Sequence, residues 1–253
     1  MLRFASLGSG SKGNATLIEA GETRILLDCG FSLRETERRL ERLGLEPRDL
    51  QGVLVTHEHS DHVGGVGVLS RKHRLPVWLT TGTLARSRDA DFFTTHIIHA
   101  HDSFKIGELD IEPFPVPHDA REPCQFVFSD GQKRLGILTD TGYITPHIER
   151  TLEGVHGLLL ECNYDPDMLR DGPYPWALKQ RVAGRLGHLA NQQAMELLGK
   201  MDHGQLDCLI AMHISENNNS PELVRAALED TLTEHVDTLH VACQQEGFGW
   251  QEL

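Results

Sequence analysis

The sequence lacks paired cysteines and long apolar runs. Its five cysteines include no C-x-x-C pair, which favours buried, reduced thiols over disulfides or a thiolate metal site. No apolar stretch approaches the roughly 18 residues of a membrane-spanning helix, and the N-terminus has no apolar signal-peptide segment. We therefore expect a cytoplasmic protein with no membrane partner.

Positive charge is also scarce. Lysine and arginine together number 24, aspartate and glutamate number 37, and the formal net charge is −13 at pH 7. This balance argues against nucleic-acid binding through bulk charge. It does not exclude a nucleic-acid substrate, because two bound divalent cations would make one site locally positive.

Low-complexity segments, internal repeats and Pro/Ser-rich linkers are absent as well, so residues 1–253 are predicted to form a single domain. Two strand-rich blocks occur, each followed by helices, and this order predicts two sheets packed face to face with helices outside, an α/β sandwich. The expected strand segments are Leu2–Leu7, Ala15–Glu19, Arg24–Asp28, Gly52–Thr56, Pro76–Leu79, a β-rich block over His96–Ser129, Lys133–Thr139, Gly157–Glu161, Cys208–Met212 and His240–Ala242.

Helices are predicted from apolar periodicity and from signals at their ends. The first runs from Ser32 to Leu43, where Ser32 and Glu35 form the pattern of a capping box and Gly44 is suited to end the helix. The later helices are expected at Trp176–Leu186, Asn191–Met201 and Pro221–Leu232.

The strongest motif is His57-Glu58-His59-Ser60-Asp61-His62, directly after the predicted strand Gly52–Thr56. His57 and His59 are two residues apart, so both can point the same way from extended backbone. Asp61 and His62 can turn toward a second position as the chain bends. Nitrogen and oxygen donors at this density suit Zn²⁺ or a similar divalent ion.

The run His57-x-His59-x-Asp61-His62 resembles the signature of the metallo-β-lactamase superfamily. The resemblance implies a four-layer αββα sandwich and a two-metal hydrolase. Further positions match the family in the same order along the chain. They are Asp28, which resembles an early acid behind the ligands, His118, the next histidine ligand, Asp140, the bridging carboxylate, and His213, the last histidine.

The resemblance also implies a cofactor of two divalent metal ions. The first would bind His57, His59, His118 and Asp140, and the second would bind Asp61, His62, Asp140 and His213. Neither set needs a cysteine, which leaves zinc and manganese as candidates.

The superfamily carries several activities, so its fold alone does not settle the function. Redox members replace the second histidine of the motif with glutamate, whereas His59 is unchanged. Secreted lactamases need an export signal. Thioester hydrolases of the glyoxalase II type carry a helical C-terminal domain, for which the 40 residues after His213 are too few.

Glu161 and His188 resemble an extra Glu/His pair of the phosphodiesterase branch. In that branch the histidine is regarded as the group that protonates the leaving oxygen, and the glutamate as the group that orients it. Phosphodiester cleavage expels an alkoxide, which needs a proton donor. The resemblance therefore implies catalytic roles for Glu161 and His188, in addition to Asp61. The alternatives are that Glu161 is a structural acid and that His188 only flanks a helix.

The narrowest match is to the YycJ/WalJ group, which is regarded as a family of DNA exonucleases working 5′ to 3′. One departure is Ala190, where serine is expected. The match implies a DNA nuclease as the function and nucleic acid, DNA rather than RNA, as the partner. It rests on Leu7–Asn14, Asn163–Pro166, Gly187-His188 and Ser215–Asn218.

A basic stretch lies between the two members of the Glu/His pair. Lys179, Arg181 and Arg185 stand there without an acidic neighbour and are candidates for binding substrate phosphates, unless they form only a solvated helix face.

Three other functions stay open: a small-molecule phosphodiesterase, an RNA-processing nuclease and a non-catalytic metal-binding module. The sequence indicates no oligomeric state.

Overall fold

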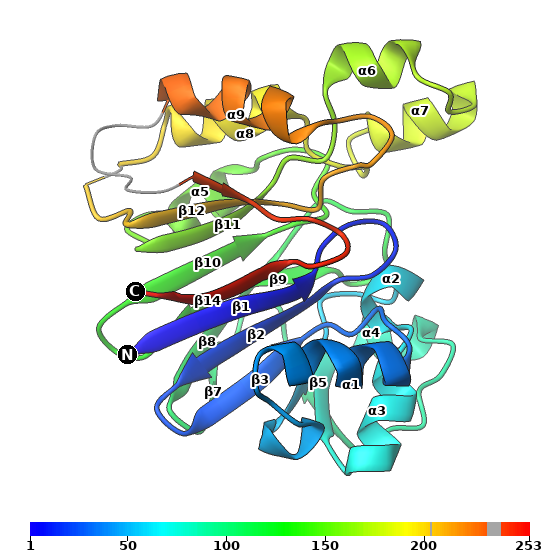
Figure 1. The fold of residues 1–253 in the computed structure, drawn as a ribbon, viewed down its shortest axis with the longest axis vertical. Helices are drawn as coiled ribbons and strands as arrows, with labels where there is room; N and C mark the ends of the chain where they lie inside the picture. The colour runs from blue at the N-terminus through cyan, green and yellow to red at the C-terminus, as the bar shows by residue number, and fades with distance from the viewer. Residues whose placement is uncertain (203, 232–238) are drawn as a thin grey trace.

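The computed structural model describes residues 1–202, 204–231 and 239–253. Within these residues, two seven-stranded sheets lie face to face, and helices cover both outer faces (Figure 1). From top to bottom the view passes through helices, one sheet, the other sheet and helices again. The predicted four-layer αββα sandwich is therefore confirmed.

The first sheet combines an antiparallel half, β14 to β3, with a parallel half, β3 to β6. Its strands, in order across the sheet, are β14 (Phe248–Glu252), β1 (Leu2–Gly8), β2 (Ala15–Ala20), β3 (Thr23–Leu27), β4 (Gly52–Leu54), β5 (Pro76–Thr80) and β6 (Thr94–Ile98).

The second sheet has the same plan, with β13 to β10 parallel and β10 to β7 antiparallel. Its strands, in order across the sheet, are β13 (Leu239–Val241), β12 (Cys208–Met212), β11 (Gly157–Glu161), β10 (Arg134–Leu138), β9 (Cys124–Ser129), β8 (Leu109–Pro115) and β7 (Phe104–Ile106).

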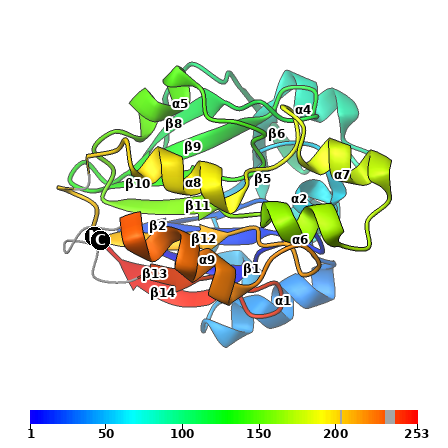
Figure 2. The same ribbon diagram turned by 90° about the horizontal axis from the view of Figure 1, so that it is seen from above.

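The helices divide between the two outer faces and one end of the sandwich. Figure 2, seen from above, shows α8 and α9 lying over β11 and β12, with α6 and α7 at one end. The α-helices are α1 (Leu33–Arg42), α2 (Ser60–Val63), α3 (Val66–His73), α4 (Thr81–Arg86), α5 (Pro146–Leu152), α6 (Pro166–Asp171), α7 (Trp176–Val182), α8 (Asn191–Leu198) and α9 (Pro221–Leu228), and short 3₁₀ turns occupy Pro47–Asp49 and Glu229–Thr231.

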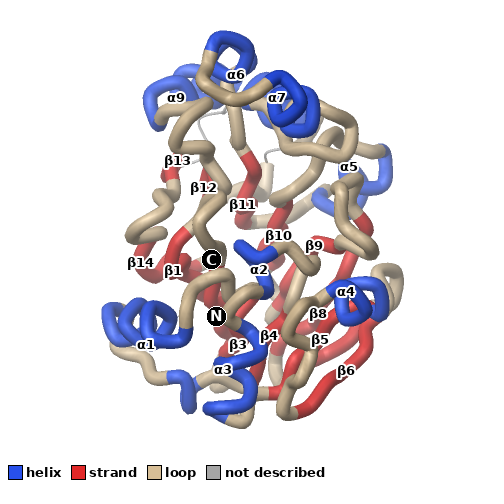
Figure 3. Tube along the Cα trace, turned by 90° about the vertical axis from the view of Figure 1, so that its right-hand side faces the viewer, coloured by secondary structure: helices blue, strands red, loops and turns tan. Residues whose placement is uncertain are grey.

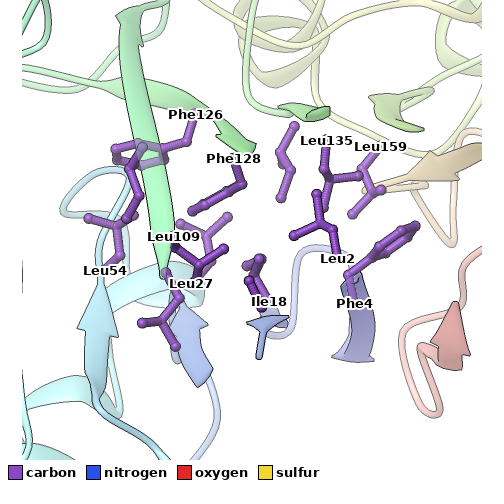
Figure 4. Packing of buried hydrophobic residues seen from close by; sticks show 14 of the residues in the cluster. Leu2, Phe4, Ile18, Leu27, Leu54, Leu109, Phe126, Phe128, Leu135 and Leu159 are labelled. Carbon is purple, nitrogen blue, oxygen red and sulfur yellow. The ribbon is translucent and has the colours of Figure 1, made fainter. Parts of the chain in front are cut away.

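Alternation along the strands sorts the apolar side chains into three cores. In β3, Ile25 and Leu27 face the second sheet, whereas Leu26 faces α1 and α3. A third core packs the second sheet against α5, α8 and α9. Burying each large apolar side chain contributes about 1.5–3 kcal/mol. Figure 4 shows the core between the sheets, where Phe126, Phe128, Leu135 and Leu159 face Leu2, Phe4, Ile18, Leu27 and Leu54.

Several predicted boundaries were wrong. The predicted helix Trp176–Leu186 ends at Val182, because the chain turns back so that the His188 amide donates to the Val182 carbonyl at 2.9 Å. A Cβ at Gly187 would overlap that same carbonyl, so glycine permits this close return. The predicted helix Asn191–Met201 ends at Leu198, before Gly199.

The ends of two other helices also differ from the prediction. Ser32 has N-cap backbone geometry, but its side chain makes no cap bond, and Glu35 pairs with Arg38 and Arg39 instead of reaching back to the Ser32 amide. The predicted capping box was therefore wrong. Helix α9 passes into a 3₁₀ turn at Glu229, and the predicted end at Leu232 lies outside the described residues.

The strand β14 was not predicted, although its pairing with β1 completes the first sheet next to the N-terminal strand. None of the described helices has the length and hydrophobicity that a membrane crossing requires.

Candidate metal centre

The residues predicted to carry the chemistry lie at the carboxyl ends of parallel strands. Asp28 directly follows β3, Glu161 ends β11 and His213 directly follows β12. His57 comes three residues after β4, and Asp140 two residues after β10. In such sheets the crevice outside the carboxyl ends of the strands is the usual place for a site. Figure 3 looks onto this end of the sandwich, where α2 lies between the two sheets.

The described residues form four overlapping groups of donor atoms, and two of these groups contain all the predicted metal ligands other than Asp140. In each group the nitrogen and oxygen atoms lie within 4.8 Å of one another, which is close enough to share one ion. The first group is His57, His59 and His118, and the second is Asp61, His62 and His213.

Asp140 lies between the two groups. Its Oδ2 is 3.3 Å from His62 Nε2, and its Oδ1 is 3.8 Å from His118 Nε2 and 3.1 Å from His213 Nδ1. The carboxylate thus faces ligands of both groups, as a bridging ligand would. The structure brings together all seven residues that the resemblance implied.

Three of the histidines make hydrogen-bond contacts through Nδ1, so that their Nε2 atoms are left for the centre. The Nδ1 of His118 donates to the Gly187 carbonyl at 2.9 Å, and the Nδ1 of His62 donates to Asp28 at 2.8 Å. The Nδ1 of His57 lies 2.9 Å from the Thr56 hydroxyl, which itself donates to Asp28 at 2.8 Å. When these imidazoles are neutral, the bonds at Nδ1 favour the tautomer with the proton on Nδ1, which leaves the Nε2 lone pair for a metal ion.

Three buried polar atoms of the predicted ligands have no hydrogen-bond partner among the described residues. They are Nε2 of His57, Oδ2 of Asp140 and Nδ1 of His213. An unpaired buried polar atom costs about 1–3 kcal/mol, so native structures rarely keep one without a reason. Divalent cations bound here would satisfy such atoms, and the His/Asp donor set suits these ions. The residues therefore fit a two-metal centre.

The charges of the centre favour cations. Burial raises the pKa of Asp61, but the charge of His62 outweighs it and lowers that pKa to about 2. Burial likewise opposes ionisation of Asp140, yet the charges of His213 and His62 hold its pKa well below the usual range. Burial lowers the pKa of His57 well below its ordinary value. The carboxylates are thus ionised and His57 is neutral, as metal ligands must be. Burial lowers the pKa of His62 and of His213, but the charge of Asp140 outweighs it and raises both, so a metal ion that binds these two side chains would displace a proton from each.

Three residues of the centre have left-handed backbone. The φ angles are 60° at Asp28, 54° at Asp140 and 53° at His213. Among the described residues other than glycine, only Arg74 joins them, at the C-cap of α3. This conformation costs of order 1 kcal/mol or more for a side chain such as histidine, and such strain gathers at functional sites.

The loop Gly8–Asn14 holds the second group of ligands in place. The buried Asn14 amide donates to the Asp61 carbonyl at 3.3 Å and lies 3.2 Å from His62 Nε2, while its Oδ1 accepts from the Gly10 amide at 2.8 Å. Ser9 Oγ accepts from the backbone amide of His213 at 2.8 Å. These contacts were not predicted from the sequence, where the segment supported only the family resemblance. Its Gly-Ser-Gly-Ser-Lys-Gly-Asn pattern was the available signal.

The predicted Glu/His pair is formed beside this centre. His188 Nδ1 lies 2.8 Å from Glu161 Oε1, and Oε2 of the fully buried Glu161 accepts from the amides of Thr141 and Leu189 at 3.0 and 3.3 Å. Burial raises the pKa of Glu161, but the charge and hydrogen bond of His188 outweigh it and lower the pKa. An ionised Glu161 therefore orients His188, whose side chain is 20% exposed.

A cavity of about 660 Å³ opens over the centre. Of the three predicted phosphate-binding residues, only Arg181 lines it, and its guanidinium is bound to Asp119 at 2.6 Å. Lys179 instead donates to the Arg170 carbonyl at 2.6 Å, and the Arg185 guanidinium lies 4.6 Å from the centre of the Tyr143 ring. Lys179 and Arg185 do not line the cavity, because Lys179 is held at α6 by this bond and Arg185, beyond the end of α7, lies at Tyr143.

Comparison with known proteins places this geometry in context. A family model described as "Beta-lactamase superfamily domain" matches residues 23–214. The exodeoxyribonuclease YycJ of Bacillus anthracis is 35% identical over 239 residues, which cover 92% of this chain and 90% of that protein. The exodeoxyribonuclease WalJ of Streptococcus pneumoniae is 33% identical, with 92% and 88% covered.

A solved structure supports the fold independently. The metallo-β-lactamase fold protein YhfI of Bacillus subtilis superposes with a TM-score of 0.75 at 14% identity. The match covers 99% of this chain and 98% of that one. At this identity the likeness concerns the fold alone.

Proposed function

This chain belongs to the β-lactamase superfamily domain family, and from that premise we propose that it is a divalent-metal-dependent phosphodiester hydrolase that degrades DNA as a 5′ to 3′ exonuclease. The observation that carries the proposal is the Glu161–His188 pair, bonded at 2.8 Å beside a complete two-metal donor set. The proposal includes a single catalytic domain over residues 1–253 that works in the cytoplasm.

The proposed cofactor is a pair of zinc or manganese ions. His57, His59, His118 and Asp140 would hold one ion, and Asp61, His62, Asp140 and His213 the other. When bound, these ions would supply Lewis acidity to the phosphoryl oxygens and a water acidic enough to react at neutral pH.

The chain's own residues supply orientation and the proton. Asp28 and Thr56 fix the ring planes of His57 and His62. Glu161 holds the Nδ1 side of His188, which leaves Nε2 as the atom that gives a proton to the departing oxygen. A positioned acid of this kind is worth about 10²–10⁴-fold in rate when the leaving group is a poor one.

DNA as the substrate is supported by the two relatives, both named exodeoxyribonucleases, that align with this chain over nine-tenths of its length. A small-molecule phosphodiesterase would need the same metal ligands and the same acid. Activity on long and on short substrates therefore has to be compared to distinguish the two functions. A non-catalytic module has no need of the Glu161–His188 pair.

The proposal is tested with purified protein, Mn²⁺ or Zn²⁺, and end-labelled single- and double-stranded DNA and RNA. We expect mononucleotide release from the 5′ end of DNA. Activity confined to short phosphodiesters, or to RNA, would contradict the DNA assignment.

The role of His188 is tested by comparing leaving groups. His188→Asn should lower kcat on DNA by about 10²–10⁴-fold, but should change little on a p-nitrophenyl ester of thymidine 5′-phosphate, whose leaving group needs no proton. The control is His99→Asn, which changes an exposed histidine away from the cavity. Equal losses on both substrates would contradict the acid role.

A further inference from the structure

Two arginines in the cavity are not used by the site described above. Arg86 and Arg88 line the cavity over the metal centre, and both side chains are exposed. Within the described part of the chain, neither guanidinium forms an ion pair or a hydrogen bond. In a protein of net charge −13, two free cations at the mouth of one cavity are unusual.

Neighbouring carboxylates that line the cavity form no ion pair with these two arginines in the described part of the chain. Glu58 lines the cavity, and its Oε1 accepts from the Arg121 amide at 2.7 Å. Asp89 also lines the cavity, but both of its oxygens are bound to Arg71 at 2.8 Å. On the α7 side, the guanidinium of Arg181 is bound to Asp119 at 2.6 and 3.2 Å. The free positive charge of the cavity is therefore concentrated at Arg86 and Arg88.

The segment that carries the arginines is firmly held. Helix α4 follows β5 at the same edge of the first sheet, and the Thr80 hydroxyl caps it by accepting from the Thr83 amide. The Gly82 amide donates to Glu122 at 2.6 Å, and Ser87 Oγ donates to the Thr83 carbonyl at 2.8 Å. Side chains on a fixed segment hold a ligand with less loss of conformational entropy.

The other side of the cavity has a different chemistry. Tyr174, Leu178 and Val182, from the segment of α6 and α7, line it and pack against one another in a small apolar cluster. Figure 3 shows α4 and α7 as separate elements around the end of the sandwich where α2 lies. One side of the cavity thus offers guanidinium groups and another offers an aromatic ring and apolar side chains.

A nucleic-acid strand has the matching two sides, because its phosphates are anionic and its bases are flat and apolar. We propose that Arg86 and Arg88 bind the phosphates that flank the scissile one, while the adjoining bases lie against Tyr174 and Leu178. This inference rests on the proposed nuclease function and assigns the phosphate-binding role to Arg86, at the end of α4, and to Arg88, two residues further on, instead of the Lys179–Arg185 stretch. Arginine suits it, because its planar fork binds two phosphate oxygens at once.

The test compares two double variants of equal charge. Arg86→Ala/Arg88→Ala removes the cavity arginines. Arg34→Ala/Arg150→Ala removes two exposed arginines elsewhere, which also form no ion pair within the described residues. Both changes make the net charge more negative by the same amount, so an effect of bulk charge appears in both.

The expected result is specific to long substrates. For a labelled oligonucleotide at low salt, the KM of the cavity variant should be at least about tenfold higher than that of the wild type. The slope of log(kcat/KM) against log[salt] should become less steep by about 1.4–1.8, the change expected for the loss of two phosphate contacts. Its kcat on bis(p-nitrophenyl) phosphate, which has no flanking phosphate, should be unchanged. An oligonucleotide KM and salt slope equal to those of the control variant would overturn the inference.

Measuring oligonucleotide binding apart from cleavage distinguishes this inference from the proposed nuclease activity. The affinity of each variant for a fluorescein-labelled phosphorothioate oligonucleotide is measured by anisotropy with the metal present. If the wild type binds without cleaving any oligonucleotide and only the cavity variant loses binding, the arginine role stands and the nuclease proposal fails. If the wild type cleaves DNA and both variants bind and cleave alike, the nuclease proposal stands and the arginine role fails.

Discussion

Replacing Asp28 by asparagine should weaken metal binding without unfolding the protein. The Asp28 carboxylate is only 4% exposed and accepts three hydrogen bonds of 2.8 Å, from the Thr56 amide, the Thr56 hydroxyl and His62 Nδ1. Asparagine has the same size and also tolerates the φ of 60° found here. The substitution therefore changes the hydrogen-bond chemistry and leaves the backbone conformation available.

The magnitude follows from the bonds that asparagine cannot accept. Its oxygen can keep the bond from the Thr56 amide, but its NH₂ group would face two donors, the Thr56 hydroxyl and His62 Nδ1. The hydroxyl can rotate, whereas the imidazole must move its proton to Nε2, the atom that binds metal. A hydrogen bond to a charged group is worth about 1.5–3 kcal/mol, and each 1.4 kcal/mol is tenfold in affinity. We expect metal affinity to fall about 10–100-fold.

The assay is competition for Zn²⁺ against a chromogenic chelator, with the metal content of the protein measured by mass spectrometry. The control is Asp91→Asn, at a side chain that is 88% exposed. Circular dichroism of the metal-free variant reports whether the fold is kept. A folded Asp28→Asn protein that binds both ions within threefold of the wild-type affinity would refute the reasoning, because His62 would then not depend on Asp28 for its tautomer.

Three further predictions concern the cap of α8, pH and thiol reactivity. Ala190 has N-cap geometry but no side-chain acceptor, so Ala190→Ser should add about 0.5–1 kcal/mol of stability and raise Tm by about 1–4 °C; an unchanged or lower Tm would contradict this. Burial lowers the pKa of His213, but Asp140 outweighs it and raises that pKa to about 10. Its stabilising contribution is present below pH ~6.5 and lost as the pH rises through about 10, so metal-free protein should lose Tm from pH 7 to 10, and His213→Gln should flatten that loss. Only Cys243 is exposed, so a thiol reagent should modify one cysteine rapidly and Cys243→Ser should remove that phase; two rapid thiols in the native protein would disprove the burial of the others.

The metal ligands could be predicted from the sequence because their chemistry is encoded in residue type and spacing. His57 to His62 is a dense run of donors, and such a run after a buried strand has few other uses. The strand periodicities placed that run at a sheet edge, and the sandwich follows from the two strand-rich blocks. Family resemblance then supplied His118, Asp140 and His213, which are far apart in sequence and adjacent in space.

The sequence did not indicate which polar side chains the fold turns toward the cavity. Lys179 and Arg185 form a visible basic cluster in the sequence. In the structure Lys179, within α7, bonds to the Arg170 carbonyl, and Arg185, beyond the end of α7, lies at the Tyr143 ring. Arg86 and Arg88 carry no motif, and the position of α4 and of the residues directly after it brings them to the cavity. Such orientation depends on tertiary contacts rather than on a local pattern.

The Asn14 amide and the β14 strand were missed for a related reason. Asn14 acts through contacts with residues 47 and 48 positions further along the chain. The pairing of β14 with β1 joins the two ends of the described chain. Neither relationship has a signature in a local window of sequence.

The two groups of ligands each take side chains from both sheets, and this division has a mechanical consequence. His57 and His59 follow β4 of the first sheet and His118 follows β8 of the second, while Asp61 and His62, in α2, lie close to His213, which follows β12 of the second sheet. Each bound ion would therefore be a cross-link, closing loops of the chain as disulfides do in secreted proteins. The five cysteines of this chain are all free. Bound metal ions would therefore be the cross-links that connect the two sheets at this edge of the sandwich.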